Sequence, residues 1–139
     1  MSSKFIIPVM ALSVAALAGA AMINTTEASA QTAAVRGNAA NGAKLFVQCR
    51  ACHTVNVGGR NGVGPNLAGV MNTTAATRAG YNFSPALKNS KMRWTAANMD
   101  NFLKRPSAAV RGTKMAFGGM PNAQARADVV AYLETLRAR

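Results

Sequence analysis

Three stretches of the chain carry apolar residues at helical spacing. They are residues 39–46, with a face of Ala39, Gly42, Leu45 and Phe46; residues 95–105, with a face of Met99, Phe102 and Leu103; and residues 122–137, with a face of Val129, Tyr132, Leu133 and Leu136. Asn38 and Asn122 are suitable N-caps for the first and the third stretch, and Thr95 opens the second. The pattern predicts an all-α fold with about three main helices.

Polar and glycine-rich segments separate these helices. Ser84, an N-cap followed by proline at the first helical position, predicts a short helix that runs to about Asn89. Pro106 ends the helix that precedes it. Residues 54–80 and 111–121 are rich in glycine and have few periodic apolar positions, and we call residues 111–121 the strap. A globular domain rarely contains a structureless stretch as long as the first of these, so we expect it to wrap a rigid cofactor that supplies the missing core.

The first thirty residues have the pattern of a secretory signal peptide. Its parts are a positive residue, Lys4; an apolar stretch, residues 5–23; and a cleavage site, Ala28-Ser29-Ala30. The alternative is an uncleaved anchor, because the apolar stretch is nearly long enough to span a bilayer. Pro8, the many alanines and the cleavage site favour removal. We therefore expect a signal peptide at 1–30 and one domain at 31–139, exported to the bacterial periplasm.

The chain is strongly basic, with 16 Lys and Arg, four Asp and Glu, and a net charge of +12 at pH 7. Lys4 and Glu27 are the only charged residues in 1–30, so removal of this segment leaves the net charge at +12. Such a field attracts anionic surfaces, and we expect acidic docking faces of redox proteins, with at most peripheral contact to an anionic membrane. An exported chain without a nucleic-acid-binding motif is not expected to bind nucleic acid. A generally basic, solvated surface without a partner is the alternative.

Cys49-Arg50-Ala51-Cys52-His53 is a C-x-x-C-H run, the attachment signature of a c-type haem. Two thiols add across the two vinyl groups of the haem, and two intervening residues let both sulfurs reach one edge of the macrocycle. The histidine that follows can turn its imidazole onto the iron. The run holds both cysteines and the only histidine of the chain. It predicts one covalent haem c per chain, bound through Cys49 and Cys52, with His53 as an axial ligand.

Three other interpretations of this run are weaker. A thioredoxin-like redox pair needs a βαβ context, and no convincing strand pattern lies nearby. A zinc site usually has four Cys or His ligands, whereas the chain contains three such residues. A disulfide between residues three apart would be strained and would leave the adjacent histidine unexplained.

The iron needs a sixth ligand or an open site, and the chain contains no second histidine. Met99 lies on a helical stripe and is expected in the core, and Met71 and Met92 are poorly placed. Met115 and Met120 both lie in the strap, whose glycines let the backbone approach a macrocycle closely. The residues alone leave these two methionines as alternatives.

Six motifs in a fixed order carry a resemblance to a known family. They are Gly42-Ala-Lys-Leu-Phe46, Cys49-x-x-Cys52-His53-Thr54, Gly64-Pro-Asn-Leu-x-Gly69, Trp94, Gly112-Thr-Lys-Met115-x-Phe117 and Val129-Val-Ala-Tyr-Leu133. With them the chain resembles the class I c-type cytochromes, namely mitochondrial-type cytochrome c and its bacterial soluble relatives, from about Gly42 to Leu136. The resemblance implies a cytochrome c fold, in which the helices and long loops enclose a single covalent haem.

The resemblance also implies roles for individual residues. It makes Met115 the distal ligand of the iron. The carbonyl of Pro65 is expected to accept a hydrogen bond from His53, which fixes the tautomer of the ring and makes it a better donor. The indole N–H of Trp94 is expected to reach a haem propionate, and Phe117 to lie against the exposed haem edge.

Gly42 and Tyr132 match the close crossing of the first and last helices in this family. The helix pattern supports the same expectation, because a glycine inside a helix costs about 1 kcal/mol relative to alanine. A glycine on the buried face therefore indicates that another helix passes close to the backbone.

The chain also departs from the family near the inner propionate. Arg, Tyr and Asn often stand there in the family, and the residues at these places are Thr73, Phe83 and Leu87. Tyr81 or Arg78 can substitute for the lost donors. With fewer donors we expect a raised propionate pKa, because burial and missing hydrogen bonds both disfavour the charged form. Arg111 replaces a proline that often precedes the Met115 motif.

The expected function is one-electron transfer by a soluble, monomeric carrier that is not an enzyme. Axial Met and His ligands and an apolar shell raise the reduction potential. The residues expected to border the exposed haem edge are Lys44, Arg50, Lys104, Arg111, Lys114 and Arg126. Respiratory, photosynthetic and dehydrogenase complexes are the candidate partners. The alternatives are a haem enzyme with a labile distal site, peroxidase-like or gas-binding, and a cytochrome subunit permanently docked to a dehydrogenase or oxidase.

Overall fold

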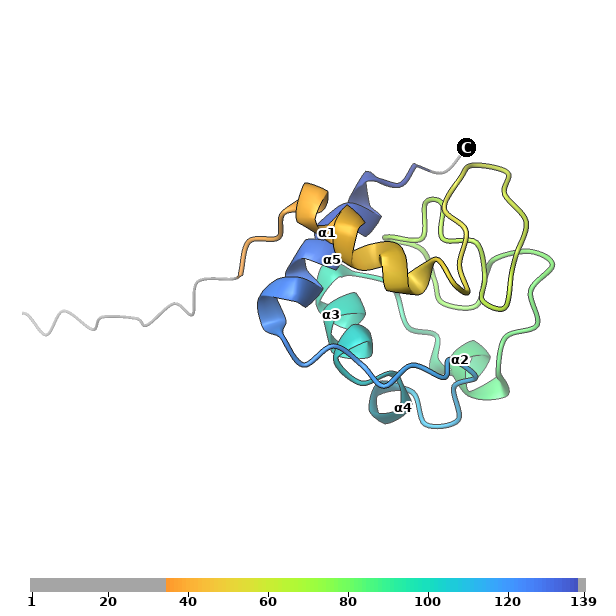
Figure 1. The fold of residues 1–139 in the computed structure, drawn as a ribbon. Coiled ribbons are helices and arrows are strands. Elements are labelled where there is room, and N and C mark those ends of the chain that lie inside the picture. The colour runs from red at the N-terminus through yellow and green to blue at the C-terminus, as the bar shows by residue number, and fades with distance from the viewer. Residues whose placement is uncertain (1–34, 138–139) are drawn as a thin grey trace, which may run out of the picture. The chain divides into compact units, whose positions relative to one another are not determined.

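The computed structural model describes residues 35–137, which belong to one structural unit. Its helices are α1 (Ala39–Leu45), which continues into the 3-10 helix η1 (Phe46–Cys49), then α2 (Pro85–Ser90), α3 (Ala96–Lys104), α4 (Pro106–Ala109) and α5 (Ala123–Thr135) (Figure 1). This part of the chain contains no β-strand, and the all-α prediction is confirmed. None of its helices combines the length and the apolar composition needed to cross a membrane. The predicted signal peptide at 1–30 lies outside the described residues.

Polar side chains close the first turns of the helices where the sequence predicts caps. Asn38, Thr95 and Asn122 each accept a hydrogen bond from the backbone N–H three residues on, at 3.1, 3.2 and 2.9 Å. Ser84 caps α2 in the same way at 3.1 Å, and Pro85 takes the first helical position. Each such cap stabilises its helix by about 1 kcal/mol.

Helices α1 and α5 cross in close contact, side by side in Figure 1. Gly42 is buried at the crossing, and a Cβ built on it would collide with the carbonyl group of Asp128. Phe46 packs on Tyr132 with ring centroids 5.2 Å apart. The Asp128 carboxylate also accepts a hydrogen bond from the backbone N–H of Asn38 at 2.7 Å, which ties the start of α1 to α5. The predicted close crossing of the first and last helices is confirmed.

Helix α3 packs against α5 and is followed at once by α4. Its three predicted core residues are buried, namely Met99, Phe102 and Leu103. Pro106 ends α3 as predicted, but it also begins α4, which the apolar pattern does not predict. Arg105 is extended, with a φ of −163°, and Pro106 then stands at the first helical position, where its missing N–H leaves no hydrogen bond unmade. Helix α5 ends at Thr135 rather than at residue 137.

Side-chain hydrogen bonds hold the long non-helical segment between η1 and α2. Asn66 is 2% exposed, and its Nδ2 donates to Thr54 Oγ1 at 2.7 Å and to the Asn56 carbonyl at 3.0 Å. Its Oδ1 accepts from the backbone N–H of Ala68 at 3.0 Å. The amide is therefore fully paired although it is buried. This cross-link fixes the turn around residue 66 against the residues that follow His53.

Candidate cofactor site

A mostly apolar cavity of about 650 Å³ lies inside this structural unit, within the usual range of about 300–1,000 Å³ for cofactor sites. Every residue predicted for the site lines it, namely Cys49, Cys52, His53, Pro65, Trp94, Met115 and Phe117. These residues come from distant parts of the chain, so the fold brings them together. Residues of α3 and α5 also line the cavity, among them Met99, Phe102, Val129 and Leu133.

The C-x-x-C-H run forms a helical turn that begins at Cys49, the last residue of η1. The backbone N–H of His53 donates to the carbonyl of Cys49 at 2.9 Å, and that of Cys52 to the same carbonyl at 3.1 Å. Because residues three and four apart share a face of a helical turn, Cys49, Cys52 and His53 are placed on one wall. The sequence folds locally into the arrangement that the motif requires.

The His53 ring is held by a hydrogen bond and by close packing. Its Nδ1 lies 2.7 Å from the carbonyl oxygen of Pro65. A carbonyl only accepts, so Nδ1 donates and Nε2 carries a free lone pair, the form of imidazole that binds a metal. Gly64 is buried against the same ring, and a Cβ added there would lie 2.7 Å from Nδ1.

Both cysteines are free thiols, Cys49 half-buried and Cys52 exposed. Burial raises the pKa of the Cys49 thiol, and the electrostatic effect of the neighbouring Cys52 raises it further. Burial at Cys49 therefore favours the neutral thiol over the thiolate.

The structure separates the two strap methionines. Met115 is half-buried and lines the cavity, whereas Met120 is 7% exposed, lies in the hydrophobic core and is not part of the lining. Met99 also lines the cavity, from the buried face of α3. Met71 and Met92 are half-buried and lie outside the lining.

The residues at which the chain departs from the family, Thr73, Phe83 and Leu87, all line the cavity. Phe83 and Leu87 are buried and line the cavity without offering a hydrogen-bond donor. Tyr81 and Arg78 line it too, but both already donate to the backbone. The Tyr81 hydroxyl donates to the Val63 carbonyl at 2.7 Å, and the Arg78 guanidinium donates to the carbonyls of Asn66, at 3.1 Å, and Ala68.

Asn66 is a residue of the cavity wall whose structural role the sequence interpretation missed. It lines the cavity, and its main-chain carbonyl holds the Arg78 guanidinium while its side chain fixes the surrounding loop. The available signal was an amide side chain inside a glycine-rich, otherwise structureless segment, where buried backbone groups need partners.

The prediction that Arg126 borders the exposed edge of the site is wrong. Arg126 is 6% exposed and forms an ion pair with Asp100, so it lies inside the fold. The other residues predicted for this edge are exposed, namely Lys44, Arg50, Lys104, Arg111 and Lys114. Of these, Lys114 lines the cavity, and its Nζ donates to the Asn82 carbonyl at 3.1 Å.

Comparison with known proteins gives a consistent result. Residues 39–137 match the family model of cytochrome c. The chain is 43% identical over 120 residues to cytochrome c2 of Rhodomicrobium vannielii, covering 86% of this chain and 92% of the relative. It is 45% identical over 105 residues to the cytochrome c-type cyt cy of Rhodobacter capsulatus, covering 75% of this chain and 52% of that relative. Among solved structures, cytochrome cH from Methylobacterium extorquens superimposes with a TM-score of 0.68 and 43% identity, covering 71% of this chain and 99% of the other.

The resemblance inferred from the six motifs and the expected cytochrome c fold are both confirmed. The family model spans most of the chain, and the relatives share over 40% of aligned residues. The chain therefore belongs to the cytochrome c family, whose members contain haem and serve electron transport.

Proposed function

We propose that this chain is an exported, soluble and monomeric one-electron carrier of the bacterial periplasm. In this proposal one haem c is attached through Cys49 and Cys52, and His53 and Met115 are its axial ligands. The main support is that one cavity collects both thiols, the only imidazole of the chain and the thioether of one strap methionine. Bacterial relatives named cytochrome c2 support the carrier function, and the pattern of residues 1–30 supports export.

The residues of the cavity fit a haem. Two free thiols and an imidazole stand on one short turn, and a thioether comes from the strap. The wall is mostly apolar, as a macrocycle requires. Arg78 and Lys114 also line the cavity and bring positive charge to it, which suits the two carboxylates of a haem.

When bound, the haem supplies an iron centre that takes up and releases one electron. The protein chain supplies the ligand atoms for the iron and determines the polarity of its surroundings. The His53 ring donates from Nδ1 to Pro65, which makes its other nitrogen a better ligand. The soft thioether of Met115 favours the lower oxidation state. Phe83 and Leu87 act in the same direction, because an apolar wall disfavours additional positive charge.

The surface charge supports encounter with acidic partners. In residues 35–137 every Lys and Arg except Arg126 is exposed. Few carboxylates of residues 35–137 offset these surface cations. Asp128 is buried and Asp100 is paired with Arg126, so Glu134 is the acidic residue of this range that is exposed. A surface of one sign steers association and raises its rate. We propose acidic docking faces of respiratory, photosynthetic or dehydrogenase complexes as the partners.

The test is expression of the full chain in a bacterium that matures c-type cytochromes, followed by periplasmic fractionation. We expect a monomeric protein that begins at Gln31, keeps its haem after acidic solvent extraction, and exchanges single electrons rapidly with small redox reagents. A matched variant with Cys49→Ala and Cys52→Ala is expected to lose the haem on extraction. Rapid binding of carbon monoxide by the reduced protein would favour a haem enzyme with a labile distal site. Isolation only in a stable complex would favour a permanent subunit.

A further inference from the structure

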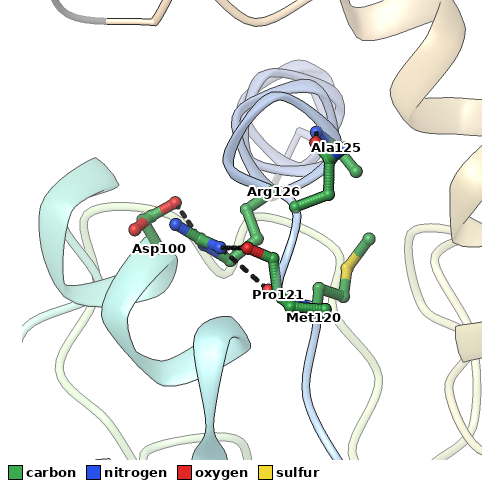
Figure 2. A network of polar contacts seen from close by, with 6 residues as sticks. Asp100, Met120, Pro121, Ala125 and Arg126 are labelled. Carbon is green, nitrogen blue, oxygen red and sulfur yellow. Dashed lines mark hydrogen bonds and ion pairs between the residues drawn. The ribbon is translucent and has the colours of Figure 1, made fainter.

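Arg126 on α5 is a buried cation that has no direct part in the proposed electron transfer. Its Nε donates to Asp100 Oδ1 at 2.8 Å, and its Nη1 donates to the carbonyl oxygens of Met120 at 2.9 Å and Pro121 at 2.8 Å (Figure 2). The Arg126 side chain is 8% exposed and that of Asp100 40%. A buried charge is costly unless it is paired and hydrogen-bonded. These contacts supply the pairing and join α3, α5 and the end of the strap through one guanidinium.

Backbone hydrogen bonds anchor the strap at both of its ends. At its start, the backbone N–H of Thr113 donates to the Val110 carbonyl at 3.0 Å. At its end, the N–H of Met120 donates to the Leu103 carbonyl at 2.9 Å. Within the described part of the chain, no backbone–backbone hydrogen bond engages residues 116–119. Movement at residue 120 can therefore reach Met115 without breaking an intervening backbone hydrogen bond.

The end of the strap lies directly against α3. Gly119 has a φ of +101°, and a Cβ added there would collide with the carbonyl of Lys104 at the end of α3. Asp100 stands one turn earlier in the same helix, and Met120 is buried in the hydrophobic core. Arg126 therefore holds the strap to α3 and α5 at the place where the strap leaves the cavity wall.

We propose that Arg126 is a positioning residue for Met115, with Asp100 as its counter-charge. Their ion pair sets how readily the thioether leaves the iron, because it fixes the end of the strap that carries it. This inference deepens the proposed function and rests on Met115 as the distal ligand.

The test uses the oxidised haem protein and two readouts. One is the affinity for added imidazole, which competes with the thioether for the iron. The other is hydrogen exchange at the Met120 amide, which reports opening of the strap end directly. The variants are Arg126→Met, which removes the cation, and Asp100→Asn, which keeps an acceptor oxygen but removes the counter-charge. The control is Asp128→Asn, which also removes a buried charge from α5 but at the contact with Asn38.

Arg126→Met is expected to raise the imidazole affinity and the Met120 exchange rate by about tenfold or more, since it removes hydrogen bonds made by a charged group. Asp100→Asn is expected to raise both by a smaller factor and provides the test should Arg126→Met fail to fold. Asp128→Asn is expected to lower the stability of the protein while both readouts stay within about twofold.

Two results would overturn the proposal. The first is that the Arg126 and Asp100 variants change the readouts no more than Asp128→Asn does. The second is faster Met120 exchange with unchanged imidazole affinity, because the clamp would then not position Met115. Met115→Ala identifies a failure of the proposed function: if this variant also leaves the affinity unchanged, the ligand assignment has failed.

Discussion

The imidazole Nδ1 of His53 lies 2.7 Å from the carbonyl oxygen of Pro65, twelve residues away in the chain. The hydrogen bond fixes the tautomer in which Nε2 is free to bind a metal. The neighbouring Gly64 makes the arrangement feasible, because a Cβ at this position would lie 2.7 Å from Nδ1 and 2.8 Å from Nε2 of the same ring. Because Gly64 has no side chain, it leaves the space that the His53 ring occupies.

Gly64→Ala is expected to displace the His53 ring and to lower the free energy of unfolding of the haem protein by about 1–3 kcal/mol, the usual cost of overpacking. Denaturant unfolding followed by circular dichroism measures this value. Gly118→Ala is the matched control, since a Cβ there has no atom within 4 Å, and its change is expected to stay within about 0.5 kcal/mol. Equal stabilities of the two variants would contradict the tight packing of the ring.

Gly42→Ala tests the crossing of α1 and α5, because two effects predict opposite changes in the free energy of unfolding. Helix propensity alone would make alanine more stable by about 1 kcal/mol. The structure predicts the opposite, a loss of about 1–3 kcal/mol, because the new Cβ meets the Asp128 carbonyl. Thermal or denaturant unfolding decides between the two, and a stabilised variant would show that the helices lie further apart.

The basic surface is expected to accelerate electron transfer to an acidic partner. The second-order rate constant, measured by stopped flow, should fall by about tenfold as salt rises from low to physiological strength. Lys114→Glu, at the cavity wall, should lower the low-salt rate more than Arg36→Glu, which makes the same charge change before α1 and outside the lining. A rate independent of salt, or equal losses in both variants, would count against steering toward the cavity.

The apolar part of the cavity wall at Phe83 and Leu87 is expected to make the reduction potential depend on pH. We expect a haem carboxylate that lies against Phe83 and Leu87, rather than beside Arg78 or Lys114, to have a raised pKa, since both residues are buried and neither donates a hydrogen bond. Loss of its proton adds negative charge and stabilises the oxidised centre, so the potential should fall as pH rises between about 5 and 8. Leu87→Asn adds a donor and should flatten this slope in potentiometric titrations. A constant potential in the unaltered protein would exclude the effect.

Local signals account for the parts of the fold that were predicted correctly. Asn38, Ser84 and Thr95 act within one helical turn of their own positions, so their capping roles can be inferred from the sequence. Helix α4 has such a signal too, because Pro106 suits the first position of a helix, but the same proline also terminates α3 and only that role was assigned.

The misplacement of Arg126 has a different cause. Whether a long cationic side chain is exposed depends on which segments lie across from it, and its partners Asp100 and Met120 come from α3 and from the strap. No periodicity within α5 distinguishes this arginine from a solvated one. The cross-link through Asn66 was missed for the same reason, since its partners Thr54 and Asn56 meet it only in the folded loop.

The thioether-to-iron charge-transfer band of the oxidised protein reports the distal ligand directly. Met115 and Met120 form a matched pair in one strap, the first at the cavity and the second in the core. Met120→Leu keeps the core volume nearly constant and is expected to retain the band, whereas Met115→Ala is expected to abolish it. Persistence of the band in Met115→Ala, or its loss in Met120→Leu alone, would contradict ligation of the iron by His53 and Met115.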